Sequence, residues 1–403
     1  MELANPAFFF LVFILLIFIT SPLVLKIVQN NLANDNKGRN KKLEGLRGLL
    51  APAVFFHHAI ITFYFYQTQK WEAPTSDFYN KLGPGPVLLF FFMTGFLFWG
   101  QNTYSKKPFS WNHFIFKRMK RLMPAYYMSL ILILIIVFSF SKWTLKTDVL
   151  TLFHAMFTWV LFGFPFGEFK PINDYTLTLY VNAAVAWSLR FEWLFYLLFG
   201  WLRQFSTIKK YFILLLALTI VKKILEIHFI NDIFKPVPAL SHLAGLYKDF
   251  YYFFVIGFNF GILASYLDNE KIRSRISKPI FRIGGLLVLL VYLFNSQVPA
   301  YGIYGSCLLF LFFISVVLDN SNKHFLHWKG FQALGHISYS VYLLHGICLF
   351  VAFHAIDRID PIISLSPNKF WAYVLGTGVF VLLASAISYR YVELPFINKN
   401  STT

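Results

Sequence analysis

The sequence is short of cysteine, and the two that it has, Cys307 and Cys348, lie far apart within apolar runs. Two separate thiols exclude a disulfide framework and a cysteine metal cluster. Charged side chains are also scarce, at 13% of the chain, whereas 57% is hydrophobic and 20% aromatic. Together with a mean hydropathy of +0.59, this composition excludes a soluble globular protein and indicates an integral membrane protein.

Acidic residues are few as well, since 18 stand against 36 lysines and arginines, and the net charge is +18. This excess does not indicate a nucleic-acid partner, because the basic residues cluster in a few short segments between apolar runs. Those segments are predicted to be cytoplasmic loops, and some of them are candidates for an anionic-ligand site.

The first apolar run, residues 8–28, has no basic residue ahead of it. We therefore expect a retained transmembrane helix and not a signal peptide. The next loop carries four basic residues against Asp35 and Glu44, and residues 106–121 carry six with no acidic residue. By the positive-inside rule both loops are cytoplasmic, so we expect the N-terminus outside and the C-terminus in the cytoplasm. The protein is predicted to be a multi-pass protein of the inner or plasma membrane.

The apolar runs predict an all-α fold, a polytopic membrane helix bundle with about eleven spans. Successive loops should alternate between the two faces of the membrane, and a crossing by the run at 150–166 would break this alternation. This run is therefore predicted to be re-entrant or interfacial. The predicted spans are residues 8–28, 46–67, 87–100, 124–140, 181–202, 211–228, 251–267, 283–294, 301–318, 334–353 and 370–391.

The second predicted span carries two basic groups on one face. Arg47 and His58 are eleven positions apart, which returns to nearly the same azimuth of a helix about 16 Å further along. This spacing places Arg47 at the membrane edge and His58 near the middle, while His57 points about 100° away and is expected to be structural. The alternatives are a snorkelling Arg47 and a neutral His58 hydrogen-bonded between helices.

Further ionisable groups are predicted at the same depth. Counting from the cytoplasmic ends of their helices places Glu192 and His345 beside His58, with Arg190 about half a turn from Glu192. Such groups are costly in a bilayer unless they pair or line a water-filled cavity. We therefore expect a shared polar cavity. The alternative is a set of interhelical salt bridges, for example Arg190 with Glu192 or Glu393.

Polar residues recur at set spacings in the stretches LEGLRGLLAPAVFFHH, GPGPVLLFFFMTGFL, FKRMKRLMPAYY, WSLRFEWLFY, LGHISYSVYLLH and SYRYVELPFI. In this order they resemble the motifs of the acyltransferase-3 family of membrane acyltransferases, and they cover the chain from about residue 41 to 396. Two positions depart from the pattern. Thr94 stands where the family has a serine, and Leu88 stands where an aspartate is common, so any role of that carboxylate is missing here.

The resemblance implies a ten-span core and a membrane O-acyltransferase. Such an enzyme moves an acyl group, with acetyl expected, from cytosolic acyl-CoA to a hydroxyl of a cell-surface polysaccharide, lipopolysaccharide or lipid-linked glycan. His58 is the expected general base, with Glu192 or His345 as its orienting partner or as a substrate contact. No metal is required for this chemistry.

The resemblance also implies binding residues. Guanidinium groups suit the phosphates of coenzyme A, so the expected donor ligands are Arg47, Arg118 and Arg121. The positions that match the family's motifs and are expected to bind substrate are Trp187, Ser188, Ser338, Tyr339 and Glu393.

The chain is expected to divide into an extra N-terminal transmembrane helix with a cytoplasmic linker (1–40), the acyltransferase domain (41–397) and a short cytoplasmic tail (398–403). No Gly-Asp-Ser esterase-like domain follows the core, so we expect a stand-alone enzyme that completes the transfer itself. A proton-coupled polytopic transporter is the alternative, because ionisable groups in mid-membrane also describe a carrier. A membrane scaffold would leave the buried charges unexplained.

Overall fold

The computed structural model describes residues 5–34, 40–104, 109–164, 169–205, 210–211, 213, 256–276, 279–319, 321 and 324–398. Most of the predicted span 211–228, the first part of the span 251–267 and nearly all of the tail 398–403 lie outside these residues. So do 35–39 and 105–108, which belong to the two predicted basic loops.

The described residues form helices joined by turns and contain no strand beyond one isolated bridge. Within the described part of the chain, six helices are long and apolar enough to cross a membrane: Pro6–Val28, Lys41–Thr68, Asp77–Gly100, Trp111–Phe140, Ser338–Asp357 and Pro367–Ile397. Four shorter apolar helices are Val149–Val160, Ile256–Leu267, Pro279–Phe294 and Ile303–Leu318. The predicted all-α, multi-pass membrane architecture is confirmed.

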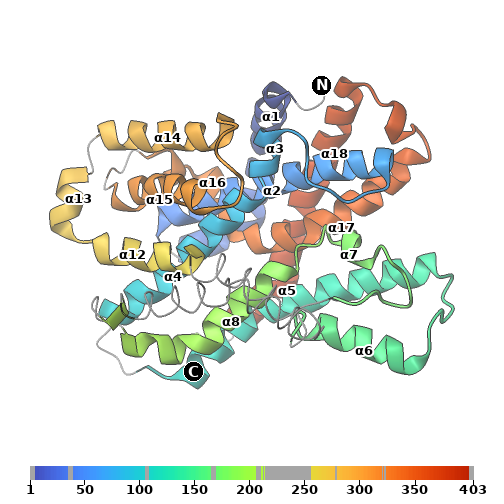
Figure 1. Cartoon of the computed structure of the whole chain (residues 1–403), viewed down its shortest axis with the longest axis horizontal. Helices are drawn as coiled ribbons and strands as arrows, with labels where there is room; N and C mark the ends of the chain where they lie inside the picture. The colour runs from blue at the N-terminus through green and yellow to red at the C-terminus, as the bar shows by residue number, and fades with distance from the viewer. Residues whose placement is uncertain are drawn as a thin grey trace, which may run out of the picture. The chain divides into compact units, whose positions relative to one another are not determined.

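Two compact units make up the chain. The first contains residues 1–86, 116–190 and 321–403, and the second contains residues 87–115 and 191–320. In the second unit, α14 (Pro279–Phe294) and α15 (Ile303–Leu318) pack side by side (Figure 1). Arg282 donates to Asp319 across this pair at 2.8 Å. This is the predicted hairpin of residues 283–294 and 301–318. The same unit holds most of α4 (Pro84–Tyr104) together with α12 (Asn259–Leu267) and α13 (Glu270–Ile276).

The first unit is built around α2 (Lys41–Thr68), which is buried over most of its length. The side chain of Asn40 caps its start by accepting hydrogen bonds from two backbone N–H groups of the first turn. The neighbours of α2 in this unit are α3 (Asp77–Lys81), α16 (Lys329–His336), α17 (Ser338–Asp357) and α18 (Pro367–Ser388). The first helix, α1 (Pro6–Asn34), packs on α16 and α18 (Figure 1).

Glycines let the beginning of α2 touch the backbone of its neighbours. A Cβ added at Gly48 would overlap the carbonyl oxygen of Phe331, and one added at Gly335 of α16 would overlap that of Glu44. Small residues of this kind allow helix backbones to approach closely in membranes. Glu44 and Gly48, in the first turns of α2, are therefore in direct backbone contact with α16.

Replacing Gly335 by alanine is expected to destabilise the protein by about 1 to 3 kcal/mol, because the new methyl group has only backbone to displace. Thermal unfolding in detergent measures the loss. The matched control is Gly376→Ala in α18, where nothing lies within 4 Å of the added atom and the intrinsic preference of alanine for helix favours the variant. Equal melting temperatures for the two variants would contradict the close packing.

The apolar run at 150–166, which was predicted not to cross the membrane, forms a helix that is too short to span a bilayer. Helix α6 (Val149–Val160) has 12 residues, or about 18 Å, against a hydrocarbon core of about 30 Å. Asp148 caps its start, and hydrogen bonds from the Thr151 side chain and backbone lower the pKa of this carboxyl. Helix α6 runs back along α5 (Trp111–Phe140) (Figure 1) as far as Tyr126, whose hydroxyl donates to the Trp159 carbonyl at 2.5 Å.

After α6 the chain runs back alongside this helix toward residues 144–146, which precede it. The indole of Trp159 donates to the Lys170 carbonyl at 2.9 Å, and the backbone N–H of Lys146 donates to Asn173 Oδ1 at 2.8 Å. The side-chain amide of Asn173 also donates to the carbonyl of Thr144, beyond the end of α5. The segment therefore runs back along part of α5 and returns toward the end of α5 from which it started.

Two predicted spans differ from the observed helices. The span 181–202 is divided into α7 (Thr178–Val181) and α8 (Trp187–Leu202), because Ala183 and Ala184 adopt left-handed backbone angles, with φ of 55° and 57°. The span 334–353 is divided between α16 and α17 at Ile337, whose φ of −91° and ψ of 1° end the first helix. The first break places the backbone of Asn182 and Ala183 against Gly346 of α17.

Candidate active site

Two histidines from different helices meet in the first unit. His345 Nε2 of α17 lies 3.0 Å from His58 Nδ1 of α2, with 5.0 Å between the ring centres. His345 is completely buried, whereas His58 keeps some exposed surface. The two residues that the helix count predicts at one depth are therefore in direct contact, and His58 is the more exposed member of the pair.

Backbone carbonyls fix the tautomers of both rings. His345 Nδ1 lies 3.0 Å from the Val341 carbonyl, and His58 Nδ1 lies 3.1 Å from the Val54 carbonyl. A carbonyl oxygen can only accept, so in the neutral rings each Nδ1 carries the hydrogen and each Nε2 carries the lone pair. His345 Nε2 can then accept from the same His58 Nδ1–H, whose hydrogen is shared between it and the Val54 carbonyl. The remaining lone pair, on His58 Nε2, is available to take a proton from a substrate.

His57 has a different environment although it is the next residue in the chain. Its Nδ1 lies 2.7 Å from the Tyr79 carbonyl, and a Cβ added at Gly83 would lie 2.5 Å from its Nε2. The ring is buried between α2 and the start of α4. These contacts give His57 a packing role between the two helices.

A turn between α7 and α8 packs on α17 beside His345. The Ser188 and Tyr342 hydroxyls are 2.7 Å apart, and Tyr342 also donates to the Val185 carbonyl at 3.2 Å. The Tyr342 ring centre is 6.1 Å from that of His345. Ser188, predicted to bind substrate, is thus buried against Tyr342 and helps to position the turn next to the histidine pair.

The predicted substrate residues at the start of α17 also make packing contacts. Ser338 is buried, and the Tyr339 hydroxyl donates to the Leu122 carbonyl of α5 at 2.9 Å. Trp187 is partly exposed at the start of α8. The Tyr339 bond joins α17 to the helix that carries Arg118 and Arg121, so this residue positions the two helices in the structure.

Glu393, another predicted substrate contact, is buried in a small polar cluster. The Ser340 hydroxyl donates to Glu393 and lies 2.9 Å from the Ser388 hydroxyl, and Arg121 interacts electrostatically with the Glu393 carboxylate. The cluster therefore joins the end of α18 and the helical turn Tyr389–Glu393 to α5 and α17. Nothing in the spacing of the sequence singles out Ser340 or Ser388.

The predicted donor-binding arginines lie in the same unit. Arg118 and Arg121 are one turn apart on α5 and both are partly exposed. Arg47 donates to Glu44 at 2.9 Å, an ion pair within the first turns of α2. Glu44 was not predicted as a partner of Arg47, although its position three residues earlier on the helix is the signal that could have found it.

Glu192 lies in the second unit, where the Tyr196 hydroxyl donates to its carboxylate. Its predicted role as a partner of His58 therefore stays a prediction. Thr94 and Leu88 belong to the same unit.

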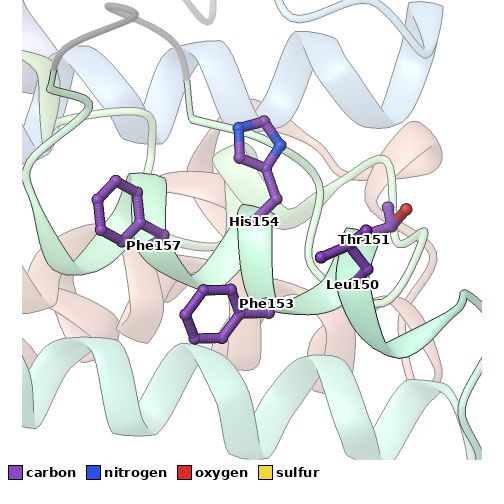
Figure 2. Close-up of a pocket in the computed structure, with 5 residues that line it drawn as sticks. All are labelled: Leu150, Thr151, Phe153, His154 and Phe157. Carbon is purple, nitrogen blue, oxygen red and sulfur yellow. The ribbon is translucent and has the colours of Figure 1, made fainter.

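A pocket lies on the surface of α6, and none of the residues that line it is a predicted site residue. Figure 2 shows the five side chains that line it, which all come from α6: Leu150, Thr151, Phe153, His154 and Phe157. Three of them are apolar, and Leu150 and Phe153 are strongly exposed. Exposed apolar side chains are normal on a membrane helix, so this pocket is not a candidate active site.

A comparison of the whole sequence with models of protein families agrees with the family that the motifs resemble. The family model described as an acyltransferase domain matches residues 40–390. The chain belongs to the acyltransferase-3 family. It is also 23% identical over 385 residues to "Peptidoglycan O-acetyltransferase OatA" of Listeria monocytogenes serovar 1/2a, which covers 89% of this chain and 56% of that relative. The chain thus spans about half the length of the curated relative. None of the solved structures matches the chain significantly.

Membership of this family places the histidine pair in an acyltransferase domain. The matched range includes both His58 and His345, as well as Arg47, Arg118 and Arg121. A multi-pass membrane acyltransferase is therefore the class of protein to which the site belongs.

Proposed function

We propose that the protein is a membrane O-acyltransferase that transfers an acyl group, with acetyl expected, from cytosolic acyl-CoA to a hydroxyl of a cell-surface polysaccharide, lipopolysaccharide or lipid-linked glycan. The observation that carries the proposal is the contact between His345 Nε2 and His58 Nδ1 at 3.0 Å, which leaves the His58 Nε2 lone pair outside the contact between the two rings. The acyltransferase domain and the O-acetyltransferase named among the relatives support this class of reaction.

In the proposed reaction the acceptor hydroxyl attacks the thioester carbonyl of the donor. His58 Nε2 takes the hydroxyl proton as the new C–O bond forms. The C–S bond then breaks, and the same proton passes from His58 to the leaving thiolate, so that the products are an ester and free coenzyme A. His345 stabilises the transient imidazolium by accepting a hydrogen bond from His58 Nδ1. This chemistry needs no metal.

The proposed donor site lies at Arg47, Arg118 and Arg121. The last two are one helical turn apart on α5 and present forked donors that match phosphate oxygens. By the positive-inside rule they face the cytoplasm, with the N-terminus outside and the C-terminus inside. The nucleotide of the donor then stays at the cytoplasmic surface while its pantetheine arm reaches His58. We assign Glu393 the role of orienting Arg121, since the two interact electrostatically.

Arg118→Ala is expected to weaken acyl-CoA binding about 10- to 150-fold, the effect of losing one or two charge-assisted hydrogen bonds to a phosphate. Isothermal titration with acetyl-CoA measures the change. Lys120→Ala is the control, because it removes the same charge from the same turn of α5, but Lys120 points to a different side of the helix and rests on the Phe116 ring, 4.4 Å away. Equal affinities for the two variants would make Arg118 only a topology anchor. Arg121→Ala is a poorer probe, because it also leaves Glu393 buried without this cation.

The test of the function itself is transfer of a radiolabelled acetyl group by the purified protein. With labelled acetyl-CoA and a panel of cell-envelope glycans, we expect alkali-labile label on a glycan and stoichiometric release of coenzyme A. A proton-coupled transporter, the alternative, would release no coenzyme A and acylate no glycan. Mass spectrometry of surface glycans from cells with and without the gene then identifies the acceptor.

A further inference from the structure

Helix α5 carries two of the proposed donor arginines, and a proline separates them from the C-terminal half of this helix. Arg118 and Arg121 precede Pro124, which lies inside α5. Proline has no backbone N–H and its ring clashes with the carbonyl four residues earlier, so helices bend most readily at such a residue. Among the described helices, none has an extended backbone contact with α5. The position of the turn that carries Arg118 and Arg121 therefore depends on the bonds that this turn makes with other elements.

Two side chains from the first turn of α17 make such bonds. The Tyr339 hydroxyl donates to the carbonyl of Leu122 at 2.9 Å, ahead of the proline and next to Arg121. The following residue, Ser340, donates to Glu393, which interacts electrostatically with Arg121. The arginine turn of α5 is thus tied to α17 directly through Tyr339 and indirectly through Ser340 and Glu393.

The same helix, α17, carries one of the two histidines of the candidate site. His345 lies six residues after Tyr339, about 9 Å along the axis of α17, and its Nε2 lies 3.0 Å from His58 Nδ1. Tyr339 therefore links the turn that is proposed to hold the donor's phosphates to the helix that holds the histidine pair. This link fixes the distance that the pantetheine arm of the donor has to cover.

We propose that Tyr339 sets the register between the donor's nucleotide, bound at Arg118 and Arg121, and the histidine pair that meets its thioester. The inference deepens the proposed function and rests on it. Tyr339 is a positioning residue, because its hydroxyl hydrogen is used by the Leu122 carbonyl. Without this bond the turn before the proline can shift together with the bound nucleotide, so the donor still binds but its thioester carbonyl lies out of line with the acceptor hydroxyl. A shift of this kind lowers the rate and not the affinity.

Tyr339→Phe tests the register with two donors, acetyl-CoA and S-acetyl-N-acetylcysteamine, a truncated thioester that has no phosphate and no nucleotide. With the first envelope glycan that the parent protein acetylates, the variant is expected to lower kcat with acetyl-CoA about 5- to 100-fold, between the effect of one lost neutral hydrogen bond and that of a small displacement of the donor. The affinity for acetyl-CoA should stay within about twofold of the parent, since both arginines remain. The kcat/KM with the truncated donor should also stay within about twofold, because this donor is not anchored at α5.

Tyr126→Phe is the matched control. The Tyr126 hydroxyl also donates to a backbone carbonyl, that of Trp159 at 2.5 Å, but it joins α5 to α6 and follows the proline in the helix. The ratio of the rates with the two donors should stay parental in this variant, even where its melting temperature falls. Ser340→Ala removes the second tie, the hydrogen bond to Glu393, and should show the same selective loss with acetyl-CoA. It provides the test if Tyr339→Phe fails to fold.

Three results would overturn the inference while the proposed function stands. Equal losses with the two donors would make Tyr339 a packing residue or a direct substrate contact. Parental kcat with acetyl-CoA would show that the bond to Leu122 does not set the register. A loss of acetyl-CoA affinity at unchanged kcat would show that the bond acts on donor binding alone. If the parent acetylates no glycan with either donor, the proposed function fails and the inference fails with it.

Discussion

Replacing His58 by alanine is expected to lower the rate of acyl transfer about 100- to 10,000-fold, the usual effect of losing a general base. The reason is that His58 Nε2 holds the one ring lone pair that the contact between the two histidines leaves unused, given the tautomers set by the Val54 and Val341 carbonyls. Expression and acetyl-CoA binding should remain close to those of the parent. Steady-state release of coenzyme A in the presence of acceptor glycan measures the change.

His57→Ala is the control for this prediction. It removes the same side chain from the next position, but the His57 ring lies against the Tyr79 carbonyl and not against His345. We expect a lower melting temperature and substantial remaining activity. If His57→Ala lost as much activity as His58→Ala at equal stability, the assignment of the base to His58 would be wrong.

The second large effect is expected at His345, where the replacement residue decides the outcome. His345→Ala removes the group that accepts from His58 Nδ1 and should lower the transfer rate about 10- to 150-fold, the effect of losing one hydrogen bond to the charged imidazolium. His345→Gln should keep much of the activity, because its amide oxygen can accept the same hydrogen bond. The measurement is kcat for glycan acylation by variants with equal acetyl-CoA affinity.

Glutamine is expected to have opposite effects at the two positions: His345→Gln keeps much of the activity, whereas His58→Gln loses it. An amide can accept a hydrogen bond but cannot take a proton at neutral pH, so glutamine serves at 345 and fails at 58. If His345→Gln were as inactive as His345→Ala, the role of His345 would involve proton transfer and not orientation alone.

The part of the site that follows from helical geometry was predictable from sequence. A rise of 1.5 Å per residue and a fixed azimuth place Arg47 and His58 on one face of α2 and His345 at the depth of His58. The contact between the two histidines needed only that α2 and α17 be neighbours. The role of each residue in catalysis remains a prediction that the experiments above test.

The loops around the site were not predictable, because tertiary contacts decide their conformation. Alanine favours helices, so the sequence indicates a continuous span through Ala183 and Ala184. In the fold both residues are left-handed, and the turn packs against Gly346. The proximity of Trp71 to His58 was missed for a similar reason, since only the chain reversal at Gln69 brings Trp71 back beside this ring.

The central claim is that His58 takes the proton of the acceptor hydroxyl, and a single-turnover experiment with His58→Gln tests it most directly. The variant and the parent are loaded with equal amounts of radiolabelled acetyl-CoA and then mixed with the acceptor glycan. We predict that the variant holds the donor as the parent does but forms no labelled glycan ester over many parental turnover times. Labelled ester formed at the parental rate by a well-folded His58→Gln protein would contradict the claim.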